Sequence, residues 1–427
     1  MEQLVSIILT SYNKPKTIAG AIESVIKQTF PHWELFIMDD NSNKETVQII
    51  KRYLHDPRIY YFNSHIKDEE RFKTTRYATL INNAIPKSKG EFITYLTDDN
   101  VFLQDRIEKM VKIFVQNPNI DIVYSQQLVK WIDETAQVVQ QFVRKTRGVL
   151  NNPVGVVDHC SIMHTRKILE KIYNLYGSYW DDDPDYWFNG DAAFWKRLTN
   201  FSLFFPIPQT LDIALKDPYS FQRLYKFLPE NIPNGTLVKG LSSDLYIIDN
   251  QERREVMPQV LERLKYDPSL AVTIPDPFLF KYNKGTPVDH TVFQNLIIMP
   301  NQRLIKSHHH PSVYYLQNNQ KRLINNERTF RQYKFQWNKI VMVDDRLLSE
   351  IPDGPAIEEI GVNSALLPDG ILFKEKRYYL SQNNHLHLIE ENVAEKLNLP
   401  IRNPVIIGRS FINRFNQGVP FTWKYIH

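Results

Sequence analysis

The stretch that decides the fold lies between Glu91 and Asn100 and reads EFITYLTDDN. Its apolar run from Phe92 to Leu96 predicts a buried strand, and two adjacent carboxylates, Asp98 and Asp99, follow almost directly. An Asp-Asp-Asn run after a strand is often only a turn that caps the next helix. Adjacent carboxylates also repel one another and stay ionised when they share a cation, so a divalent-metal site is the alternative.

Strand and helix patterns alternate before this stretch and continue just beyond it. We expect strands at residues 5–9, 34–38, 59–62 and 92–96, and helices at residues 17–28, 44–53, 78–84 and 105–114. This alternation with continuously apolar strands predicts an α/β domain around a mostly parallel, twisted sheet. Ligands of such sheets lie beyond the carboxyl ends of the strands. We therefore expect the polar clusters Thr10–Asn13, Asp39-Asp40 and Asp98-Asp99 to converge on one edge.

The composition of the whole chain sets limits on its class. The chain has 427 residues, enough for about two or three domains. Its 52 basic and 48 acidic residues leave a net charge of +4, so strong non-specific binding of nucleic acid is not expected. The single cysteine, Cys160, cannot form an internal disulfide and favours a reducing, cytoplasmic compartment. No apolar run is long enough to predict a transmembrane segment.

The sequence changes character along its length. A basic stretch at residues 134–153 is expected to be a mobile connection, and residues 158–164 are expected to form a strand. By about residue 230 the strand–helix alternation ends, and three similar segments follow from Asn234, Asn301 and Asp369. Each has an apolar strand, an aromatic strand, an Asn-containing turn and a return strand, which is a hairpin pattern. We therefore expect one domain at residues 1–230 and a module of three β-rich repeats at about 231–290, 291–357 and 358–427.

The residue types of the N-terminal clusters suit a nucleoside diphosphate held with a metal. The Thr10–Asn13 loop offers hydroxyl groups and an aromatic face, and either acid of Asp39-Asp40 can accept the imide N–H of a uracil or thymine ring. Arg71, Lys73 and Arg76 can neutralise phosphates, and carboxylate oxygens suit Mg²⁺ or Mn²⁺. Neither a Gly-x-Gly-x-x-Gly loop nor a Walker lysine is present, which argues against dinucleotide oxidoreductases and P-loop ATPases.

Several motifs then appear in a familiar order. They are VSIILTSYNKP from Val5, QTFPHWELFIMDDNSN from Gln28, TTRYATLINNAI from Thr74, EFITYLTDDN from Glu91, VDHCSIMH from Val157, YGSYWDDDP from Tyr176 and NGDAAFW from Asn189. Together they resemble the family 2 nucleotide-sugar glycosyltransferases of the GT-A fold, most closely those of spore coat polysaccharide biosynthesis. The resemblance covers roughly the first half of the chain. With its C-terminal extension, the full length is similar to spore maturation proteins.

The resemblance implies a role for particular residues of this chain. On the donor side, Thr10 and Tyr12 would lie at the nucleoside, and Asp40 would bind the pyrimidine ring with Asp39 beside it. Arg71 would lie near the base and the phosphates, Asp98 would contact the ribose, and Asp99 would bind the metal. On the acceptor side, Asp158 and His159 would line the site. Asp191 would be the general base, although residues alone also allow it to be a helix N-cap. Many members have Glu-Asp where this chain has Gly190-Asp191. The Gln-x-x-Arg-Trp motif of processive members is absent, so a non-processive enzyme is expected.

The expected function is that of an inverting, metal-dependent hexosyltransferase. It would move a sugar from a UDP- or dTDP-sugar to a hydroxyl group of a saccharide or protein-linked glycan, in spore coat or spore surface polysaccharide synthesis. The alternative is a catalytically silent scaffold protein of the spore surface that binds a nucleotide or sugar. In either case the C-terminal repeats are expected to hold the acceptor polymer, a partner enzyme or a spore layer, or to serve self-association.

Overall fold

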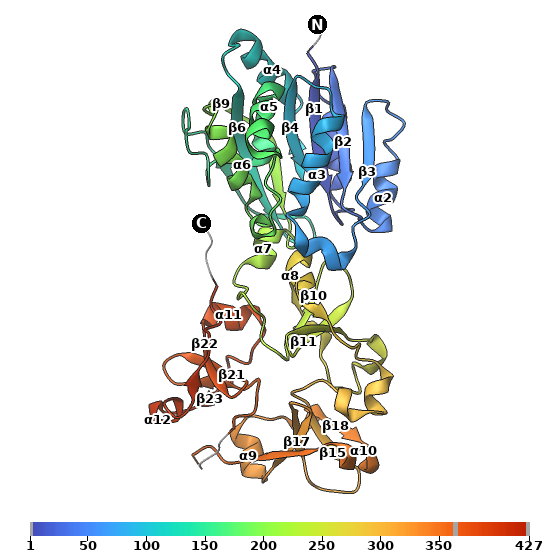
Figure 1. The fold of residues 1–427 in the computed structure, drawn as a ribbon, viewed down its shortest axis with the longest axis vertical. Helices are drawn as coiled ribbons and strands as arrows, with labels where there is room; N and C mark the ends of the chain where they lie inside the picture. The colour runs from blue at the N-terminus through green and yellow to red at the C-terminus, as the bar shows by residue number, and fades with distance from the viewer. Residues whose placement is uncertain (1–2, 362–365, 424–427) are drawn as a thin grey trace. The chain divides into compact units, whose positions relative to one another are not determined.

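The computed structural model describes residues 3–361 and 366–423 of the chain. The chain divides into two compact units, Met1–Ser220 and Phe221–Ile426, which we call the N-terminal unit and the C-terminal unit. The division falls close to the boundary near residue 230 that the change of sequence pattern indicated. Each unit is described by itself below (Figure 1).

The N-terminal unit is built around one nine-stranded sheet in which eight strands follow the order β3-β2-β1-β4-β8-β6-β9-β5 and β7 pairs with β6. The strands are β1 (Val5–Ser11), β2 (Trp33–Asp39), β3 (Ile59–Asn63), β4 (Phe92–Thr97), β5 (Asn100–Phe102), β6 (Ile122–Ile132), β7 (Val138–Arg144), β8 (Ile162–Thr165) and β9 (Phe205–Lys216). The four strands that the sequence predicted before residue 100 are all present and parallel to one another.

The sheet as a whole is mixed, so the prediction of a mostly parallel sheet was wrong. The pairs β4–β8, β6–β8, β6–β7 and β5–β9 are antiparallel, whereas β6–β9 is parallel. The physical reason is that only the first four strands are separated by crossover helices, which parallel neighbours require. The later strands do not all alternate with helices, so the strand–helix pattern of the first hundred residues does not predict their direction.

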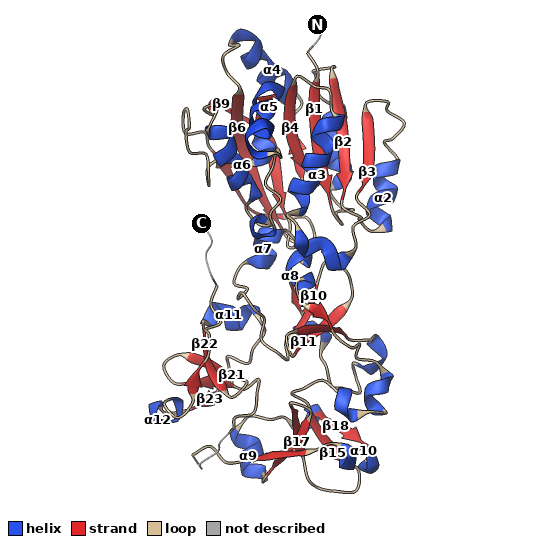
Figure 2. Ribbon diagram, in the orientation of Figure 1, coloured by secondary structure: helices blue, strands red, loops and turns tan. Residues whose placement is uncertain are grey.

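Helices cover both faces of this sheet, which explains why its central strands are apolar throughout. They are α1 (Ile18–Ile26), α2 (Lys44–Lys51), α3 (Arg76–Ala84), α4 (Arg106–Gln116), α5 (Arg166–Tyr176) and α6 (Gly190–Thr199), with short 3₁₀ turns η1 (Asp68–Lys73), η2 (Ile85–Lys87), η3 (His159–Ser161) and η4 (Pro184–Tyr186). Successive side chains of β1 point to opposite faces. Ile7 packs in the cluster with α1, α2 and α4, and Ile8 in the one with α3, α5 and α6 (Figure 2).

The stretch at residues 134–153 is not the mobile connection that its composition suggested. Strand β7 occupies Val138–Arg144 and pairs with β6 as a hairpin. The turn between them is fixed by Asp133, whose Oδ1 accepts hydrogen bonds from the backbone N–H groups of Thr135 and Gln137. The prediction failed because most of β7 is exposed on both faces, so no buried alternation marks it in the sequence.

The C-terminal unit contains three five-stranded sheets with one shared pattern. Their orders are β13-β10-β11-β12-β14, β18-β15-β16-β17-β19 and β23-β20-β21-β22-β24. In each sheet three central strands form an antiparallel meander, and the two outer strands pair with it in parallel. The first central strand of each sheet lies near the start of one of the three similar sequence segments, which begin at Asn234, Asn301 and Asp369.

The bounds of these elements are short. The strands are β10 (Leu237–Lys239), β11 (Leu245–Asp249), β12 (Glu252–Glu255), β13 (Val272–Thr273), β14 (Asn283–Lys284), β15 (Leu304–Ser307), β16 (Tyr314–Gln317), β17 (Gln320–Ile324), β18 (Ile340–Val343), β19 (Asp353–Ile357), β20 (Leu372–Lys374), β21 (Tyr378–Gln382), β22 (His385–Ile389), β23 (Val405–Ile406) and β24 (Asn416–Gln417). The helices are α7 (Phe221–Tyr225), α8 (Asp276–Phe280), α9 (Glu327–Gln332), α10 (Asp345–Glu350), α11 (Glu391–Lys396) and α12 (Arg409–Ile412), with 3₁₀ turns η5 (Pro258–Val260), η6 (Pro268–Leu270), η7 (His290–Phe293), η8 (Leu296–Ile298) and η9 (Trp337–Lys339). Across the described residues of the chain, the helices lack the combination of length and apolar character that crossing a bilayer requires.

Candidate functional site

Strands β1, β2 and β4 bring the three polar clusters together at their carboxyl ends. In the parallel register, Ser11 lies beside Asp39, and the buried Thr10 lies beside Thr97 at the end of β4. Beyond the strands, the backbone N–H of Tyr12 donates a hydrogen bond of 2.7 Å to Oδ2 of Asp98. The clusters that are far apart in the sequence therefore share one edge of the sheet.

On the β2 side of this edge, an ion-pair network surrounds Asp40. Nη1 of Arg71 lies 2.7 Å from Oδ2 of Asp40, and Nη2 of Arg76 lies 2.6 Å from Oδ1. The guanidinium group of Arg71, itself almost fully buried, lies 4.1 Å from the centre of the Tyr12 ring. Such stacking of a guanidinium on an aromatic face orients both groups. Tyr12, Asp40 and Arg71 are therefore adjacent, and a ring bound by Asp40 would have to share or replace a guanidinium contact.

Asp39 has a different set of partners, although it is the immediate neighbour of Asp40. Its Oδ2 accepts hydrogen bonds from the Tyr61 hydroxyl at 3.0 Å and from Nδ2 of Asn63 at 2.7 Å. Burial raises the pKa of Asp39, because the charged form loses water. The pair of adjacent aspartates is thus divided between a guanidinium network and a neutral hydrogen-bond network.

The acid pair at the end of β4 forms the most negative corner of the edge. Asp98 is buried, and burial followed by repulsion from Asp99 raises the pKa of Asp98. Oδ1 of Asp99 accepts a 2.7 Å hydrogen bond from the Thr97 hydroxyl, and its backbone oxygen accepts one from the N–H of Leu215 on β9. A cation shared by the two carboxylates would relieve their repulsion.

Two further residues belong to this corner and were missed by the sequence analysis. Nζ of Lys14 lies 2.7 Å from Oδ2 of Asp217. Burial opposes its charge, yet Asp99, Asp217 and Asp98 together raise the pKa of Lys14. Lys14 could have been found, because it continues the Thr10–Asn13 loop, but Asp217 follows β9, a strand without a clear sequence signal.

This donor set fits a hard divalent cation. Three carboxylates and one ammonium group leave the corner with an excess of negative charge, and their oxygens are the ligands that Mg²⁺ and Mn²⁺ prefer. Asp99 is the partly exposed member of the acid pair, whereas Asp98 is buried and already accepts the Tyr12 N–H. The residues present therefore suit a metal held at Asp99, as the resemblance implied.

A second cluster lies where η3 and the start of α6 meet. Asp191 is in the first turn of α6, where its Oδ1 accepts a 2.8 Å hydrogen bond from the N–H of Ala192. The Tyr77 hydroxyl accepts a 2.6 Å hydrogen bond from the N–H of Gly190, and the Tyr77 ring lies parallel to the His159 ring, 6.1 Å between centres. Asn189, rather than Asp191, is the N-cap residue of α6. The alternative that Asp191 is only a helix N-cap is therefore wrong.

The charges around Asp191 come from η3. Burial raises the pKa of the Asp191 carboxyl group, with His159 acting against the rise and Asp158 adding to it. For Asp158, burial also disfavours the charge, but His159, Lys216 and Arg144 outweigh it and hold the pKa well below its usual range. Asp158 is thus the permanently ionised acid of the pair, and Asp191 is the acid better suited to take up a proton.

The turn η3 also replaces part of a predicted strand. Residues 158–164 do not form one strand, since His159–Ser161 is a 3₁₀ turn and only Ile162 begins β8. The turn forms because Oδ1 of Asp158 accepts a 3.0 Å hydrogen bond from the N–H of Cys160.

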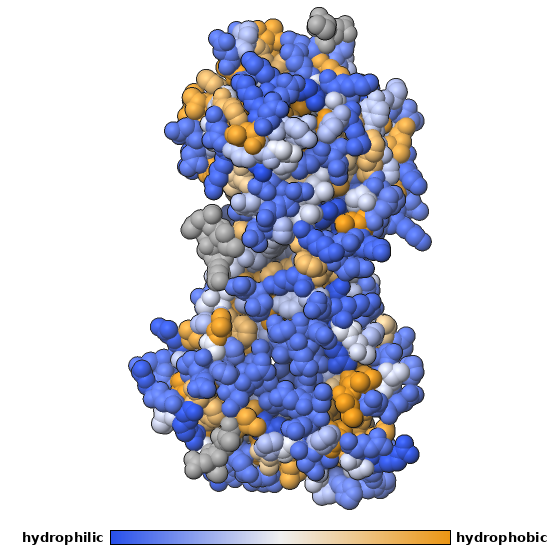
Figure 3. All heavy atoms as spheres, viewed as in Figure 1, coloured by the Kyte–Doolittle hydropathy of each residue, from blue (hydrophilic) through white to orange (hydrophobic). Residues whose placement is uncertain are grey.

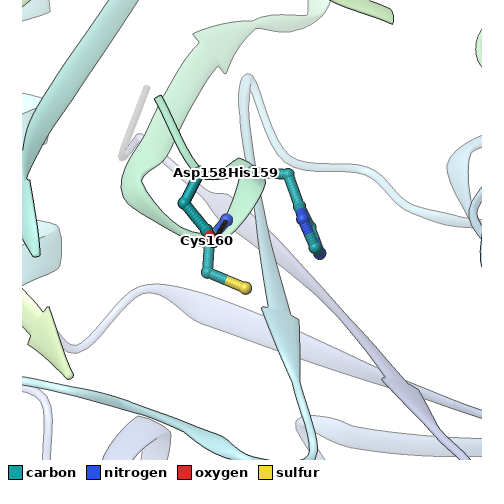
Figure 4. Close-up of side chains that lie close together, drawn as sticks. All are labelled: Asp158, His159 and Cys160. Atoms are coloured by element: carbon teal, nitrogen blue, oxygen red, sulfur yellow. Dashed lines mark hydrogen bonds between the residues drawn. The ribbon is translucent and has the colours of Figure 1, made fainter. Parts of the chain in front are cut away.

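Donor atoms of Asp158, His159 and Cys160 lie within 4.8 Å of one another, a spacing that could hold a metal ion (Figure 4). Two observations speak against that use. Oδ2 of Asp158 is paired with Nη1 of Arg144 at 3.0 Å, and burial raises the pKa of the Cys160 thiol, which disfavours the thiolate that a metal needs.

Thr97 connects the two clusters. Its hydroxyl donates to Asp99 and lies 3.7 Å from Sγ of Cys160, which is the middle residue of η3. The negative corner at Asp99 and the acids at η3 and α6 are therefore parts of one region of the N-terminal unit.

Comparison with known proteins shows the family of the chain. Residues 6–173 match the family described as Glycosyl transferase family 2. Over 427 residues the chain is 40% identical to Protein CgeD of Bacillus subtilis (strain 168), covering 99% of this chain and 96% of that protein. The chain belongs to the CgeD family. The resemblances to family 2 glycosyltransferases and, over the full length, to this protein are both confirmed.

Two further comparisons cover a smaller part of this CgeD family member. The chain is 33% identical over 124 residues to the UDP-Glc:alpha-D-GlcNAc-diphosphoundecaprenol beta-1,3-glucosyltransferase WfgD of Escherichia coli, covering 29% of this chain and 45% of that enzyme. Among solved structures, S. aureus TarS 1-349 in complex with UDP superposes with a TM-score of 0.39 and 17% identity, over 52% of this chain and 63% of that one. By its family 2 domain, the chain is a glycosyltransferase with a GT-A-like α/β fold.

Proposed function

We propose that this glycosyltransferase moves one sugar at a time from a UDP- or dTDP-sugar to a hydroxyl group of a saccharide or protein-linked glycan, with inversion at the anomeric carbon. The observation that carries the proposal is the convergence of two acid clusters, linked by Thr97, in a family 2 domain. One cluster is suited to a diphosphate with its metal, and the other is suited to a proton acceptor. An inverting transfer needs both.

The donor would lie along the edge formed by β1, β2 and β4. We assign the nucleoside to Thr10, Tyr12, Asp39, Asp40, Arg71 and Asp98. The Tyr12 ring is held in place by Arg71, and the acids Asp39 and Asp40 offer acceptors for the imide N–H of a pyrimidine. Arg71 and Arg76, which both pair with Asp40, also provide positive charge for the phosphates. UDP and dTDP share this imide, so the proposal covers both.

Asp99 is the residue that would hold Mn²⁺ or Mg²⁺. Lys14 interacts electrostatically with Asp99 and forms an ion pair with Asp217. When bound, such a cation supplies positive charge that offsets the charge of the departing nucleoside diphosphate. Lys14 contributes positive charge at the same corner by itself, because its ammonium group is fixed by Asp217.

The acceptor would be activated at the second cluster. Asp191 takes the proton of the attacking hydroxyl as the new bond between that oxygen and the anomeric carbon forms, and the bond from this carbon to the diphosphate oxygen breaks with its electron pair. Asp158 stays ionised and pairs with Arg144, which places a fixed negative charge next to His159. His159 favours the ionised form of both acids, and its ring stacks on the ring of Tyr77.

The biological setting is also part of this proposal. The single cysteine supports a reducing, cytoplasmic compartment, and the motifs of the N-terminal unit resemble enzymes that make spore coat polysaccharide. We therefore place the reaction in the synthesis of spore surface polysaccharide or glycoprotein.

A panel of nucleotide sugars tests the donor assignment. Thermal unfolding of the purified full chain would be followed with UDP- and dTDP-sugars, each with Mn²⁺ and with a chelator. A true donor raises the melting temperature by mass action, and the rise should need the metal. Hydrolysis of the stabilising donor then separates an enzyme from a silent binding protein. If no nucleotide sugar stabilises the chain with Mn²⁺, the proposed donor class is wrong.

A further inference from the structure

The three sheets of the C-terminal unit carry equivalent tight turns in their central hairpins. Each turn consists of two residues with positive φ, a backbone conformation that asparagine and glycine adopt more readily than other residues. The turns are Asn250-Gln251, Asn318-Asn319 and Asn383-Asn384, with φ angles from 52° to 60°. Five of the six residues at these positions are asparagine. The turns therefore present a repeated set of amide side chains.

Equivalent side chains follow each turn at the third residue of the return strand. Arg254, Arg322 and His387 occupy this position, and each contacts the backbone oxygen of the Gly-containing segment of its own sheet. The contacts are Arg254 Nε to Thr286 O at 2.8 Å, Arg322 Nε to Pro355 O at 2.8 Å and His387 Nδ1 to Val419 O at 2.8 Å. Each of the three also forms a hydrogen bond with the residue that precedes its turn. These preceding residues are Asp249, Gln317 and Gln382, respectively. Local geometry thus repeats in all three sheets.

The sheets are also joined to one another in a closed ring. In each case, the residue before the turn of one sheet accepts a hydrogen bond from the residue that opens another sheet. The bonds are Asn301 Nδ2 to Asp249 Oδ1 at 2.9 Å, Asp369 N to Gln317 Oε1 at 3.3 Å and Asn234 N to Gln382 Oε1 at 2.8 Å. The second sheet is bonded to the first, the third to the second and the first to the third. The C-terminal unit therefore has approximate three-fold symmetry.

The centre of this ring is closely packed. Gly235, Gln302 and Gly370 are equivalent positions, and all three have positive φ. A Cβ atom on Gly235 would lie 2.0 Å from Oε1 of Gln302, and one on Gly370 would lie 2.2 Å from the same atom. The Gln302 side chain fills the space that two glycines leave at the axis. The ring is thus a specific structure rather than a loose array.

Clefts lie at two of the seams of this ring, at corresponding places. The first, between the second and third sheets, has a volume of about 200 Å³ and is lined by Gln317, Gln320, Arg322, Pro355 and Asn383 among others. The second, between the third and first sheets, has a volume of about 320 Å³ and is lined by Glu230, Gln251, Gln382, His387 and Val419 among others, so it contains one acidic residue beside its amides. Each combines the residue before a turn, the Arg or His of the return strand, an apolar residue and a turn amide of the next sheet.

The lining selects the chemical class of the occupant. Amide side chains offer donors and acceptors without charge, which suits hydroxyl groups that both donate and accept. The side chains of Asn318, Gln320 and Asn383 form no hydrogen bond within the described residues, so they remain available to a ligand. Arg322 is satisfied by Gln317 and by backbone oxygens, which removes the obvious site for an anion. The visible face of this unit is largely hydrophilic (Figure 3).

We propose that the C-terminal unit is a multivalent saccharide-binding ring that holds neutral sugar units of a glycan in equivalent clefts between its sheets. The larger cleft, of about 320 Å³, lies at the lower end of the roughly 300–1,000 Å³ range of small-ligand pockets, and the smaller, of about 200 Å³, lies below it, so each suits at most a single sugar unit. Corresponding clefts on one ring match a ligand that itself repeats. Two weak sites on one polymer give a much higher combined affinity. This binding is a separate activity and does not depend on the proposed transfer reaction.

Binding can be measured on the full chain with the Asp191→Asn substitution, so that turnover does not alter the probe. The probe is an immobilised array of neutral oligosaccharides built from hexose, N-acetylhexosamine and 6-deoxyhexose units, tested at low and high salt. Asn383→Gly removes one cleft amide, and Gln251→Gly removes one from the other cleft. Glycine keeps the positive φ of both turns. Because Gln251→Gly also removes the hydrogen bonds from Nε2 to Ile232 O and Asn234 Oδ1, the melting temperature of every variant is measured alongside binding. Asn250→Gly is the matched control, because Asn250 is the equivalent turn residue but lines neither of the two clefts.

We expect salt-independent binding to at least one neutral oligosaccharide. Asn383→Gly and Gln251→Gly should each lower the affinity for a polymer of that sugar at least about tenfold, and Asn250→Gly should leave it unchanged. Absence of binding to every neutral probe, or binding that neither cleft substitution weakens, would overturn the proposal. Binding only to charged glycans that disappears at high salt would also overturn it. None of these results bears on donor hydrolysis, which tests the transferase separately.

Discussion

Replacing Asp191 by asparagine should sharply reduce transfer while making the protein more stable. Asparagine keeps an oxygen that can accept the hydrogen bond from Ala192, so the first turn of α6 is preserved. It cannot take a proton from an acceptor hydroxyl. Loss of a general base costs about 10²- to 10⁴-fold in rate. Nucleotide binding should be unchanged, because the donor edge contains other residues.

The stability effect follows from the direction of the pKa shift. Burial raises the pKa of Asp191 in the folded chain above its ordinary value of 3.8. A carboxyl group with a raised folded pKa destabilises the folded state, and this penalty grows as the pH rises from the ordinary pKa to the raised one and is complete above it. At pH 7 the neutral asparagine therefore removes a penalty and should raise the melting temperature. The gain should vanish at a pH well below 3.8, where the acid is protonated in both states.

The assay combines turnover with thermal unfolding. Initial rates with a stabilising nucleotide sugar and Mn²⁺ would be measured, and melting temperatures would be followed from pH 8 down to a pH well below 3.8. Asp185→Asn is the control, since Asp185 is an exposed acid on the neighbouring turn η4 and should change neither quantity. A variant at Asp191 that keeps wild-type turnover would remove the base assignment. If the melting temperature of Asp191→Asn at pH 7 were lower than that of the wild type, ionised Asp191 would not destabilise the folded chain.

Further expectations concern the rest of the N-terminal unit. Asp99→Ala should weaken UDP binding only when Mn²⁺ is present; calorimetry that shows equal affinities would contradict the metal assignment. Tyr77→Phe leaves the N–H of Gly190 without its acceptor and should cost about 1–3 kcal/mol, measured by urea unfolding, with an unchanged midpoint as the contrary result. Arg71→Lys keeps a positive charge but loses the planar group over Tyr12, so nucleotide affinity should fall measurably; full retention would mean that the stacking is irrelevant.

The order of strands and helices before residue 100 could be predicted because its cause is local. Apolar runs such as Phe92–Leu96 are buried on both faces whatever follows them, and the parallel neighbours need the helices that the pattern shows. Family 2 membership was likewise readable, since several motifs occur in one order. The same local signals placed the acids after β2 and β4.

The remaining features depend on contacts between distant residues. The antiparallel pairings of the sheet were missed, because the direction of a strand depends on partners far along the chain. The hairpin at β7 and the turn at η3 were missed or misassigned, because an exposed strand and a capped turn leave weak local patterns. Lys14 and Asp217 are 203 residues apart, and no local pattern joins them.

The sequence alone determined which residues are chemically able to act: the paired acids, the basic side chains and the Asn-containing turns that repeat. Only the tertiary structure decided which of them act together, because pKa values and hydrogen bonds depend on neighbours in space. It separated Asp158, held ionised by nearby positive charge, from Asp191, whose burial raises its pKa. It also closed three similar segments into one ring, through hydrogen bonds that no single segment contains.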